Sequence, residues 1–335
     1  MIRLKSVMTI TFIIVSLYLL SSITAGVSGQ TSKPKVVLTI EVLKEYVSPL
    51  LCGDEEVDYI VPKGLDAHTY ELRASDLDKL RRAEIIVSSG HTGFELQIRE
   101  KASKNELHAL YIDIMDTPGI TLLKIPGYNS TNYHLPISDP YNYIRFAMHF
   151  AEKIGESYPE RAECYYRKAS SVVLEVTRLI ETYGHRSNMT AVISSPRLQY
   201  YVSWLGVEVK YSLNPEETIE PSAGLLEKIE ADMKNGWVNL VVVSGNRAPS
   251  EEYLKAHAQQ HGIPVVDLQL TRDEDILGRL SAVASLVAGV HGGENATNLS
   301  QPPSPQWGMT QIIALSAGIF LAGLAVGILV GKHGV

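Results

Sequence analysis

Residues 160–183 read ERAECYYRKASSVVLEVTRLIETY, and this stretch decides the organisation of the chain. It contains no Gly or Pro, it follows Pro159, and its apolar residues recur at helical spacing. At 1.5 Å per residue the predicted helix is ~36 Å long, longer than most helices of globular proteins. We therefore predict that residues 160–184 form a rigid linking helix between two halves; the alternative is two shorter helices separated by a break.

Both flanking halves have the pattern of parallel βαβ units. In the first half, the predicted strands are the Val- and Ile-rich segments 36–40, 57–61 and 84–89. They alternate with helical stretches at 41–51 and 75–83. The corresponding segments of the second half are 191–195, 207–213, 239–245 and 264–270. The predicted fold class is α/β, with an N-terminal lobe (34–159), a C-terminal lobe (190–290), a parallel sheet in each lobe and a ligand cleft between them.

The two ends of the 335-residue chain are apolar. Residues 1–25 begin with basic residues, continue with an apolar run and end in small residues, which is the order of a signal peptide. Residues 309–330 carry no charge and are long enough to cross a bilayer, and Lys332 follows them. We predict a C-terminal transmembrane helix that anchors an extracellular globular domain to the cell surface, with residues 291–308 as a flexible stalk.

Composition excludes several classes of protein. At 45% hydrophobic and 20% charged residues, the bulk of the chain is globular rather than polytopic. A net charge of −7 argues against a nucleic-acid partner. Four N-x-S/T sequons are typical of an exported glycoprotein and lie at Asn129, Asn188, Asn295 and Asn298. The two cysteines, Cys52 and Cys164, are too few for a Cys-rich metal site; they either pair or remain separate.

Polar residues follow successive predicted strands, where open α/β sheets bind ligands. They are His68, His134, Ser195 and Asp267, two from each lobe. The chain contains no GxSxG, HExxH, GxGxxG or phosphate-loop motif. Binding without catalysis is therefore the predicted activity.

The motifs around these residues resemble the metal-specific solute-binding proteins of ABC importers, which capture zinc, manganese or iron. The similar segments span about residues 34–290 and are VPKGLDAHTYEL (61–72), SSGHTGFE (88–95), HLPISDP (134–140), NPEETIEPS (214–222) and VVDL (265–268). The resemblance implies that His68, His134 and Asp267 hold a divalent metal, zinc or manganese and also iron, as transported ligand. It also implies delivery to an ABC permease with its ATPase.

The chain departs from the family pattern at the third ligand, where the family has His or Glu and this sequence has Ser195. His134 also lies five residues before Asp139, whereas the family spacing is usually four. One account is a metal site with three protein ligands and water, or one that recruits His91; Ser195 and His91 are thus further candidate ligands. The other account is a surface-anchored module of the same fold with a non-metal ligand or a protein partner.

An enzymatic alternative is an exported metallohydrolase that uses His68, His134 and Asp267 around a zinc-bound water. Because no sequence signature supports it, we predict that the chain is not an enzyme. Of the remaining candidates, Tyr200, Tyr201 and Trp204 are predicted to be core residues, and His257 and His261 surface residues.

Overall fold

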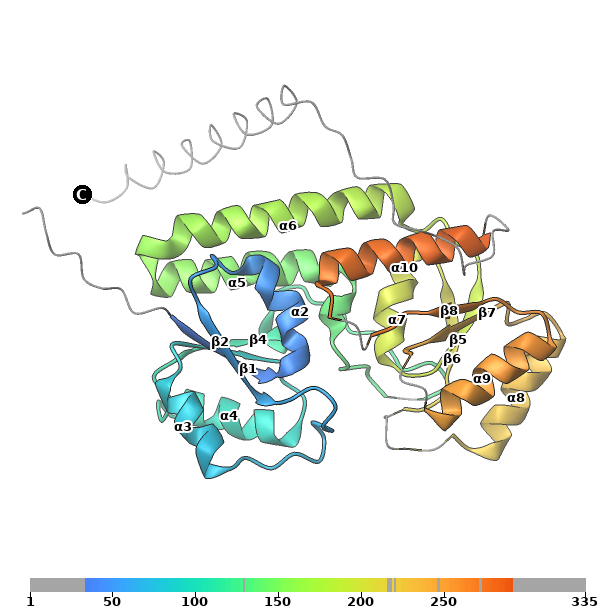
Figure 1. The fold of residues 1–335 in the computed structure, drawn as a ribbon, viewed down its shortest axis with the longest axis horizontal. Helices are drawn as coiled ribbons and strands as arrows, with labels where there is room; N and C mark the ends of the chain where they lie inside the picture. Colours follow the sequence, from blue (N-terminus) through green and yellow to red (C-terminus); the bar gives the residue numbers. More distant parts are fainter. Residues whose placement is uncertain are drawn as a thin grey trace, which may run out of the picture.

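The protein has two α/β lobes beneath a layer of long helices (Figure 1). The structure is a computed structural model that describes residues 34–128, 130–215, 219, 221–245, 248–270 and 273–291. The predicted signal peptide, the predicted anchor and the stalk beyond His291 lie outside these residues, as do three of the four sequons. None of the described helices is long and apolar enough to span a membrane.

The first lobe is built on a four-stranded parallel sheet of order β2-β1-β3-β4. Its strands are β1 (Lys35–Ile40), β2 (Glu56–Val61), β3 (Ile85–Ser88) and β4 (Leu110–Asp113). Helices α3 (Ala74–Arg82) and α4 (Gly93–Ser103) pack on one face. Every residue of β3 is buried, as expected for a parallel strand covered on both faces.

Two features of this lobe differ from the sequence prediction. Strand β4 was not predicted, because it is short and only half of its residues are buried. The expected helix at 41–51 is instead three short pieces, η1 (Glu41–Leu43), α2 (Lys44–Val47) and η2 (Ser48–Leu50). Pro49 lies in η2, where it has no backbone N–H to extend an α-helix.

The second lobe repeats this topology with the order β6-β5-β7-β8. Its strands are β5 (Thr190–Ile193), β6 (Glu208–Ser212), β7 (Leu240–Val243) and β8 (Val265–Asp267), all parallel. Its helices are α7 (Arg197–Val202), α8 (Ala223–Lys234), α9 (Pro249–Gln260) and α10 (Ile276–His291). The 3-10 turn η6 (Ser203–Leu205) follows α7. Two further 3-10 turns lie earlier in the chain: η3 (Ile114–Asp116) follows β4, and η4 (Pro136–Ser138) precedes the helix that begins at Pro140.

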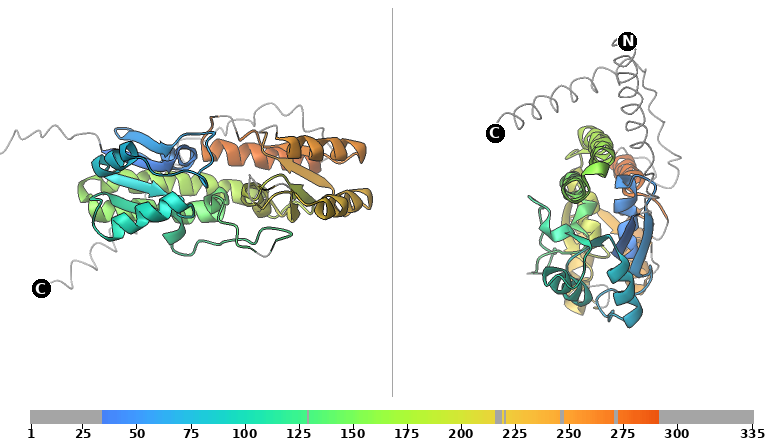
Figure 2. Two further views of the ribbon diagram at one scale, coloured as in Figure 1. Left: turned by 90° about the horizontal axis from the view of Figure 1, so that it is seen from below. Right: turned by 90° about the vertical axis from the view of Figure 1, so that its left-hand side faces the viewer.

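The predicted linking helix is α6 (Ala162–Tyr183), which runs unbroken for 22 residues over both lobes. Its first predicted turn is the 3-10 segment η5 (Pro159–Arg161), so the α-helix begins at Ala162 rather than Glu160. Helix α5 (Pro140–Ser157) packs along α6, and α10 also lies against it. In the end-on view of Figure 2, α5 and α6 lie at one end of the molecule, beyond both sheets.

The largest hydrophobic cluster among the described residues runs from the first sheet through the helical layer into the second sheet, and a smaller cluster lies on the outer face of each sheet. Phe150 on α5, Val172 on α6 and Leu280 on α10 are all buried in it. The predicted core residues Tyr200, Tyr201 and Trp204 are also buried, which confirms that prediction. Because both lobes share this core, a rigid-body rotation between them must expose apolar surface, at a cost of about 25 cal/mol per Å².

Buried polar contacts connect the lobes as well. Glu45 on α2 lies 3.2 Å from the guanidinium Nε of Arg279 on α10 and 3.6 Å from Nη2 of Arg197 on α7. Tyr46 and Tyr201, also from opposite lobes, share a hydrogen bond of 2.8 Å. Since a buried charge is stable only when paired, these contacts hold the two lobes in one arrangement.

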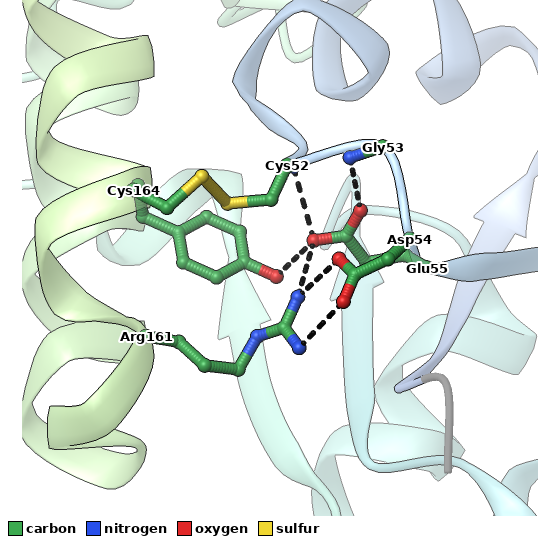
Figure 3. Close-up of a disulfide and its surroundings, with 7 residues drawn as sticks. Cys52, Gly53, Asp54, Glu55, Arg161 and Cys164 are labelled. Carbon is green, nitrogen blue, oxygen red and sulfur yellow. Dashed lines mark hydrogen bonds and ion pairs between the residues drawn. A yellow bond between two sulfur atoms is a disulfide. The ribbon is translucent and has the colours of Figure 1, made fainter. Parts of the chain in front are cut away.

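A disulfide between Cys52 and Cys164 joins the first lobe to α6 (Figure 3). Their Cα atoms are 6.1 Å apart, and they lie 112 residues apart in sequence. Beside the bridge, the guanidinium of Arg161 contacts Asp54 and Glu55, with Nη2 3.1 Å from the Glu55 carboxylate. Burial alone would raise the pKa of Glu55, but hydrogen bonds from Tyr165 and nearby backbone N–H groups hold it below its usual value.

Candidate metal centre

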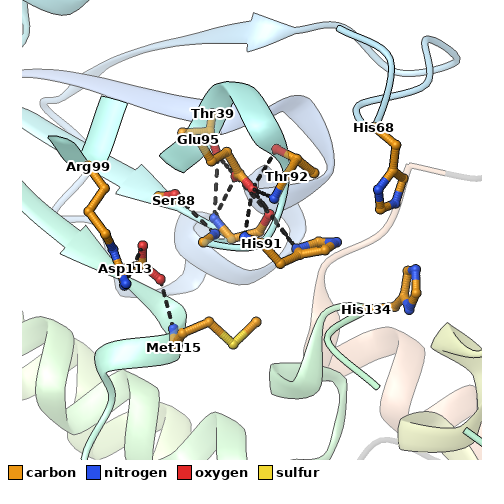
Figure 4. Close-up of polar contacts among 12 residues, drawn as sticks. Thr39, His68, Ser88, His91, Thr92, Glu95, Arg99, Asp113, Met115 and His134 are labelled. Carbon is orange, nitrogen blue, oxygen red and sulfur yellow. Dashed lines mark hydrogen bonds and ion pairs between the residues drawn. The ribbon is translucent and has the colours of Figure 1, made fainter. Parts of the chain in front are cut away.

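Three histidines meet at the carboxyl edge of the first sheet (Figure 4). His68 follows β2, His91 follows β3 and His134 follows β4, so parallel topology brings their loops to one edge. Their ring centroids are separated by 5.3 Å (His68 to His91), 5.6 Å (His68 to His134) and 5.5 Å (His91 to His134). One ring nitrogen from each lies within 4.8 Å of the other two.

The position of His68 is set by a short turn at Asp66. The backbone N–H of His68 donates to Oδ1 of Asp66 at 2.9 Å, and the Thr69 hydroxyl donates to the Asp66 carbonyl at 3.3 Å. Asp side chains commonly organise turns in this way. His68 is exposed, whereas the other two histidines are half-buried, so it lies on the solvent side of the cluster.

His91 lies directly before α4 and beside a buried carboxylate. Its Nδ1 is 3.3 Å from the Ser89 hydroxyl and 4.0 Å from Oε2 of Glu95. Figure 4 shows the ring directed from this carboxylate toward His68 and His134. A carboxylate near one imidazole nitrogen orients the ring and increases the basicity of the other nitrogen, an arrangement common around metal-binding histidines.

Glu95 is held in its ionised form by a dense set of donors. It accepts hydrogen bonds from the hydroxyls of Thr39, Ser89 and Thr92 and from the backbone N–H groups of Ser89, His91 and Thr92. Burial alone would raise the pKa of Glu95, but these bonds and the neighbouring His91 lower it. The fully buried carboxylate therefore carries a negative charge next to the histidine cluster.

Gly90 allows the backbone directly before His91 to pack closely against the Asp113 carboxylate. Its φ is +78°, and a Cβ at this position would lie 2.0 Å from Oδ1 of Asp113. The Asp113 carboxylate itself is fixed by Arg99 at 2.9 Å and by the Met115 backbone N–H at 2.9 Å. Both the backbone conformation and the lack of space thus require glycine beside His91.

His134 is positioned by Asn132. Both the backbone N–H and the Nδ1 of His134 lie 3.1 Å from Oδ1 of Asn132. The amide Nδ2 of Asn132 in turn donates to the Pro196 carbonyl at 2.8 Å and to Oε1 of Gln199 at 3.0 Å. These two acceptors in the second lobe fix the amide orientation, so Oδ1 faces the imidazole and Nδ1 carries the proton. Nε2 is then the nitrogen with a lone pair for a metal.

The backbone adopts a left-handed conformation directly after His134. Leu135 has φ +48° and is buried, and η4 begins directly after it. An L-residue in this conformation costs roughly 1–2 kcal/mol, so the surrounding structure must enforce it. His134 lies in the cluster, five residues before Asp139 in the sequence.

Ser195 and Asp267 lie in the second lobe, at the ends of β5 and β8. Oδ1 of Asp267 accepts from the Gln269 backbone N–H at 3.0 Å, and Oδ2 lies 3.7 Å from the Lys255 ammonium. Ser195 is half-buried, and its carbonyl accepts from the Leu198 backbone N–H at 3.1 Å. Among the described residues, no carboxylate joins the group of ring nitrogens within 4.8 Å. The structure therefore brings together His68, His134 and His91, but not Asp267.

A separate cavity of about 330 Å³ lies between the lobes. It is lined by residues of both lobes, among them Glu41 and Glu45 from the first and Asp273 to Asp275 from the second. Across this cavity, Nζ of Lys63 in the first lobe lies 3.2 Å from Oδ1 of Asp273 in the second. The three histidines are not part of its lining, so the candidate metal centre belongs to the loops of the first lobe.

Two parallel-sheet lobes, a long linking helix and imidazoles gathered at a sheet edge define a solute-binding protein of the kind that captures metal ions. Residues 36–275 match the family model ZnuA, described as zinc-uptake complex component A, periplasmic. The chain belongs to this family.

Curated relatives carry different metals in their names. The chain is 25% identical over 247 residues to the manganese ABC transporter substrate-binding lipoprotein PsaA of Streptococcus pneumoniae, covering 68% of this chain and 79% of PsaA. It is 23% identical over 273 residues to the iron ABC transporter substrate-binding lipoprotein MtsA of Streptococcus pyogenes, covering 76% and 85%. Among solved structures, a zinc-bound AdcAII variant of Streptococcus pneumoniae superposes with a TM-score of 0.63 at 18% identity, covering 77% and 98%. That likeness shows the shared fold.

The protein is thus the substrate-binding component of a metal ABC importer. The resemblance identified from the sequence is confirmed, and so is the prediction that the chain is not an enzyme. Sequence reasoning did not identify Asn132 or Glu95 as supports of the histidines. Glu95 lies within the recognised segment SSGHTGFE, but its contact with Thr39 is long-range in sequence and invisible there.

Proposed function

We propose that the protein captures zinc outside the cell with His68, His91 and His134 and delivers it to an ABC permease. The observation that supports this is the approach of three ring nitrogens to within 4.8 Å of one another. Zinc binds imidazole nitrogen at about 2.0–2.1 Å in tetrahedral sites, so bound nitrogens lie roughly 3.3 Å apart. Side-chain rotations of His68, on its exposed loop, can supply most of the remaining closure.

The donor set favours zinc over manganese. Imidazole suits zinc, copper, iron and nickel, whereas manganese prefers carboxylate, carbonyl and water oxygens; at a given site the general affinity for divalent manganese and iron is also lower than that for zinc. The cluster offers three nitrogens and, within the described residues, no carboxylate oxygen that lies within 4.8 Å of all three. Manganese and iron, the metals named for the two relatives, are therefore expected to bind more weakly.

The fourth coordination position is open to a water molecule or to a ligand from the second lobe. Asp267 remains our candidate, and Ser195 the weaker one because a neutral hydroxyl is a poor ligand. To ligate, Asp267 must exchange its contacts with Gln269 and Lys255 for the metal. We propose that the histidines form the primary ligand set and that Asp267 adds to it.

The proposed location follows from the segments outside the described residues. We propose that residues 1–25 act as a signal peptide that exports the chain, and that the apolar segment 309–330 holds it at the cell surface with the lobes outside. The permease and its ATPase are then the partners on the same membrane. Glycosylation is proposed at Asn188, which is exposed on the surface.

Thermal unfolding of the chelator-treated, full-length chain tests this function. Metal that binds only the native state must raise the unfolding temperature, and at about 100 times Kd it adds about 2.7 kcal/mol to stability. We expect the largest shift with zinc and a much smaller shift in His68→Ala. His108→Ala, at an exposed histidine outside the cluster, is the matched control and should behave as the native chain. No shift with any metal would favour the module with a non-metal ligand.

A further inference from the structure

A second group of metal-ligating side chains lies on the other lobe, between α8 and α9. Glu230 on α8 faces His257 and His261 at the end of α9, and one ligand atom from each lies within 4.8 Å of the others. Nδ1 of His257 is 3.9 Å from Oε1 of Glu230. These two helices lie next to each other on the outside of the second lobe (Figure 1).

The two histidines have helical spacing that suits a metal. Residues i and i+4 project from the same face of an α-helix, one turn apart. A His pair at this spacing is a recurrent zinc-binding arrangement, completed by a further ligand from a neighbouring element. Here α9 supplies the pair, with His261 as its C-cap residue, and α8 supplies the carboxylate.

Packing holds this group in place, but two of its imidazole nitrogens lack hydrogen-bond partners within the part of the chain that the structure describes. The ring of His257 packs against that of Tyr253 in a tilted arrangement with centroids 4.1 Å apart, which restricts its rotation. Nδ1 of His257 and Nε2 of His261 are buried and have no hydrogen-bond partner among the described residues. Buried nitrogens that lack partners are rare, because their lost hydration is not repaid. A metal ion between them would supply the missing interaction.

This group is independent of the three histidines of the candidate metal centre. All three of its members come from helices of the second lobe, whereas His68, His91 and His134 come from loops of the first. All three are half-buried, so an ion can enter from solvent without any movement of the lobes.

We infer that Glu230, His257 and His261 form a second binding site for a divalent metal of zinc type. Two imidazoles and one carboxylate supply three ligands, and water completes the tetrahedron. The site ties α8 to α9, so metal binding there stabilises the second lobe. The site has one carboxylate ligand and is partly exposed. It shares no residue with the three histidines of the first lobe, so it holds its ion separately from the metal that the importer carries.

Equilibrium dialysis of the full-length chain against zinc, with metal and protein both quantified, tests this inference. We expect about two zinc ions per chain for the native protein and about one for His257→Ala/His261→Ala. The variant His68→Ala/His91→Ala/His134→Ala should retain about one zinc ion, held at the second site. His108→Ala, at an exposed histidine in neither group, is the control and should bind as the native chain does.

A conservative substitution guards against loss of the fold. Glu230→Gln keeps the size of the side chain and removes its charge, so we expect roughly tenfold weaker binding at the second site with an unchanged circular dichroism spectrum. Complete loss of zinc in folded His68→Ala/His91→Ala/His134→Ala, with folding checked by circular dichroism, would overturn the inference. Unchanged zinc binding in His257→Ala/His261→Ala would overturn it equally.

Discussion

Nδ1 of His134 lies 3.1 Å from Oδ1 of Asn132, and the amide of Asn132 is fixed from the opposite lobe by the Pro196 carbonyl. One buried side chain thus sets the tautomer of a candidate ligand in the first lobe through contacts in the second. The state of the interface between the lobes is therefore coupled to the metal centre, although every histidine of the centre belongs to one lobe.

Replacing Asn132 with Ala tests this coupling. Loss of a hydrogen-bond partner behind a metal-binding histidine typically lowers affinity about 10–100-fold, and the lost buried bonds should cost about 1–3 kcal/mol of stability. Zinc affinity can be measured by competition with a chelating dye at a temperature where the variant is folded. Unchanged affinity in folded Asn132→Ala would show that Asn132 does not orient the imidazole.

His91→Ala should weaken zinc binding more than Asp267→Asn does. His91 lies within the group of ring nitrogens, whereas Asp267 is engaged with Lys255 and a backbone N–H. We expect more than a 10–100-fold loss for His91→Ala, the range typical of an outer partner, and a smaller loss for Asp267→Asn. The reverse order in the same dye competition would return Asp267 to the primary ligand set.

Asp139 gives the fold a pH dependence of defined sign. This residue caps α5 by accepting from the backbone N–H groups of Tyr141 and Asn142, and burial raises its pKa to about 6 despite these bonds. Because the folded-state pKa is above that of the unfolded chain, this group's favourable contribution is complete below about pH 4 and is lost as pH rises toward about 6.

Asp139→Asn should therefore stabilise the protein by about 1–3 kcal/mol above pH 6 and have little effect near pH 4. Asn accepts the same two N–H bonds as a helix N-cap but cannot ionise. Urea unfolding of both proteins at pH 4 and pH 8 measures the difference. An equal effect at both values would mean that ionisation of Asp139 is not the cause.

Removal of the disulfide should lower stability without affecting metal binding. The Cys52 to Cys164 bridge closes a loop of about 112 residues, and a loop of this size contributes roughly 2–5 kcal/mol, chiefly by restricting the unfolded chain. Cys52→Ser/Cys164→Ser should unfold at a lower temperature and bind zinc with native affinity. A large loss of zinc affinity would instead place the bridge among the supports of the metal centre.

The overall fold could be predicted because periodicity is local. Val- and Ile-rich strands, and a long segment without Gly or Pro, are visible in single windows of sequence, and both lobes and α6 are present as expected. Strand β4 was not predicted because it is short and ends in Asp113, an acidic residue whose buried carboxylate is held by Arg99 on α4 and by the Met115 backbone N–H. Such a partner is found only in three dimensions.

Part of the candidate site could be predicted because the position of a polar residue after a strand is also visible locally in the sequence. Their positions after strands predicted that His68 and His134 lie at one sheet edge, where their ring centroids are 5.6 Å apart, and the same rule was applied to Asp267. That rule places a residue at an edge of its own sheet, but it does not specify the distance between edges of two different sheets. Asp267 remains a predicted ligand, while His91, a secondary candidate by sequence, is the third member of the cluster.

X-ray absorption at the zinc K-edge tests the central claim most directly, on the full-length His257→Ala/His261→Ala variant, which lacks the inferred second site, loaded with one equivalent of zinc. Binding by His68, His91 and His134 predicts about three imidazoles per zinc at about 2.0–2.1 Å, falling to about two when His91→Ala is added. The same imidazole count with and without His91→Ala would contradict the three-histidine site.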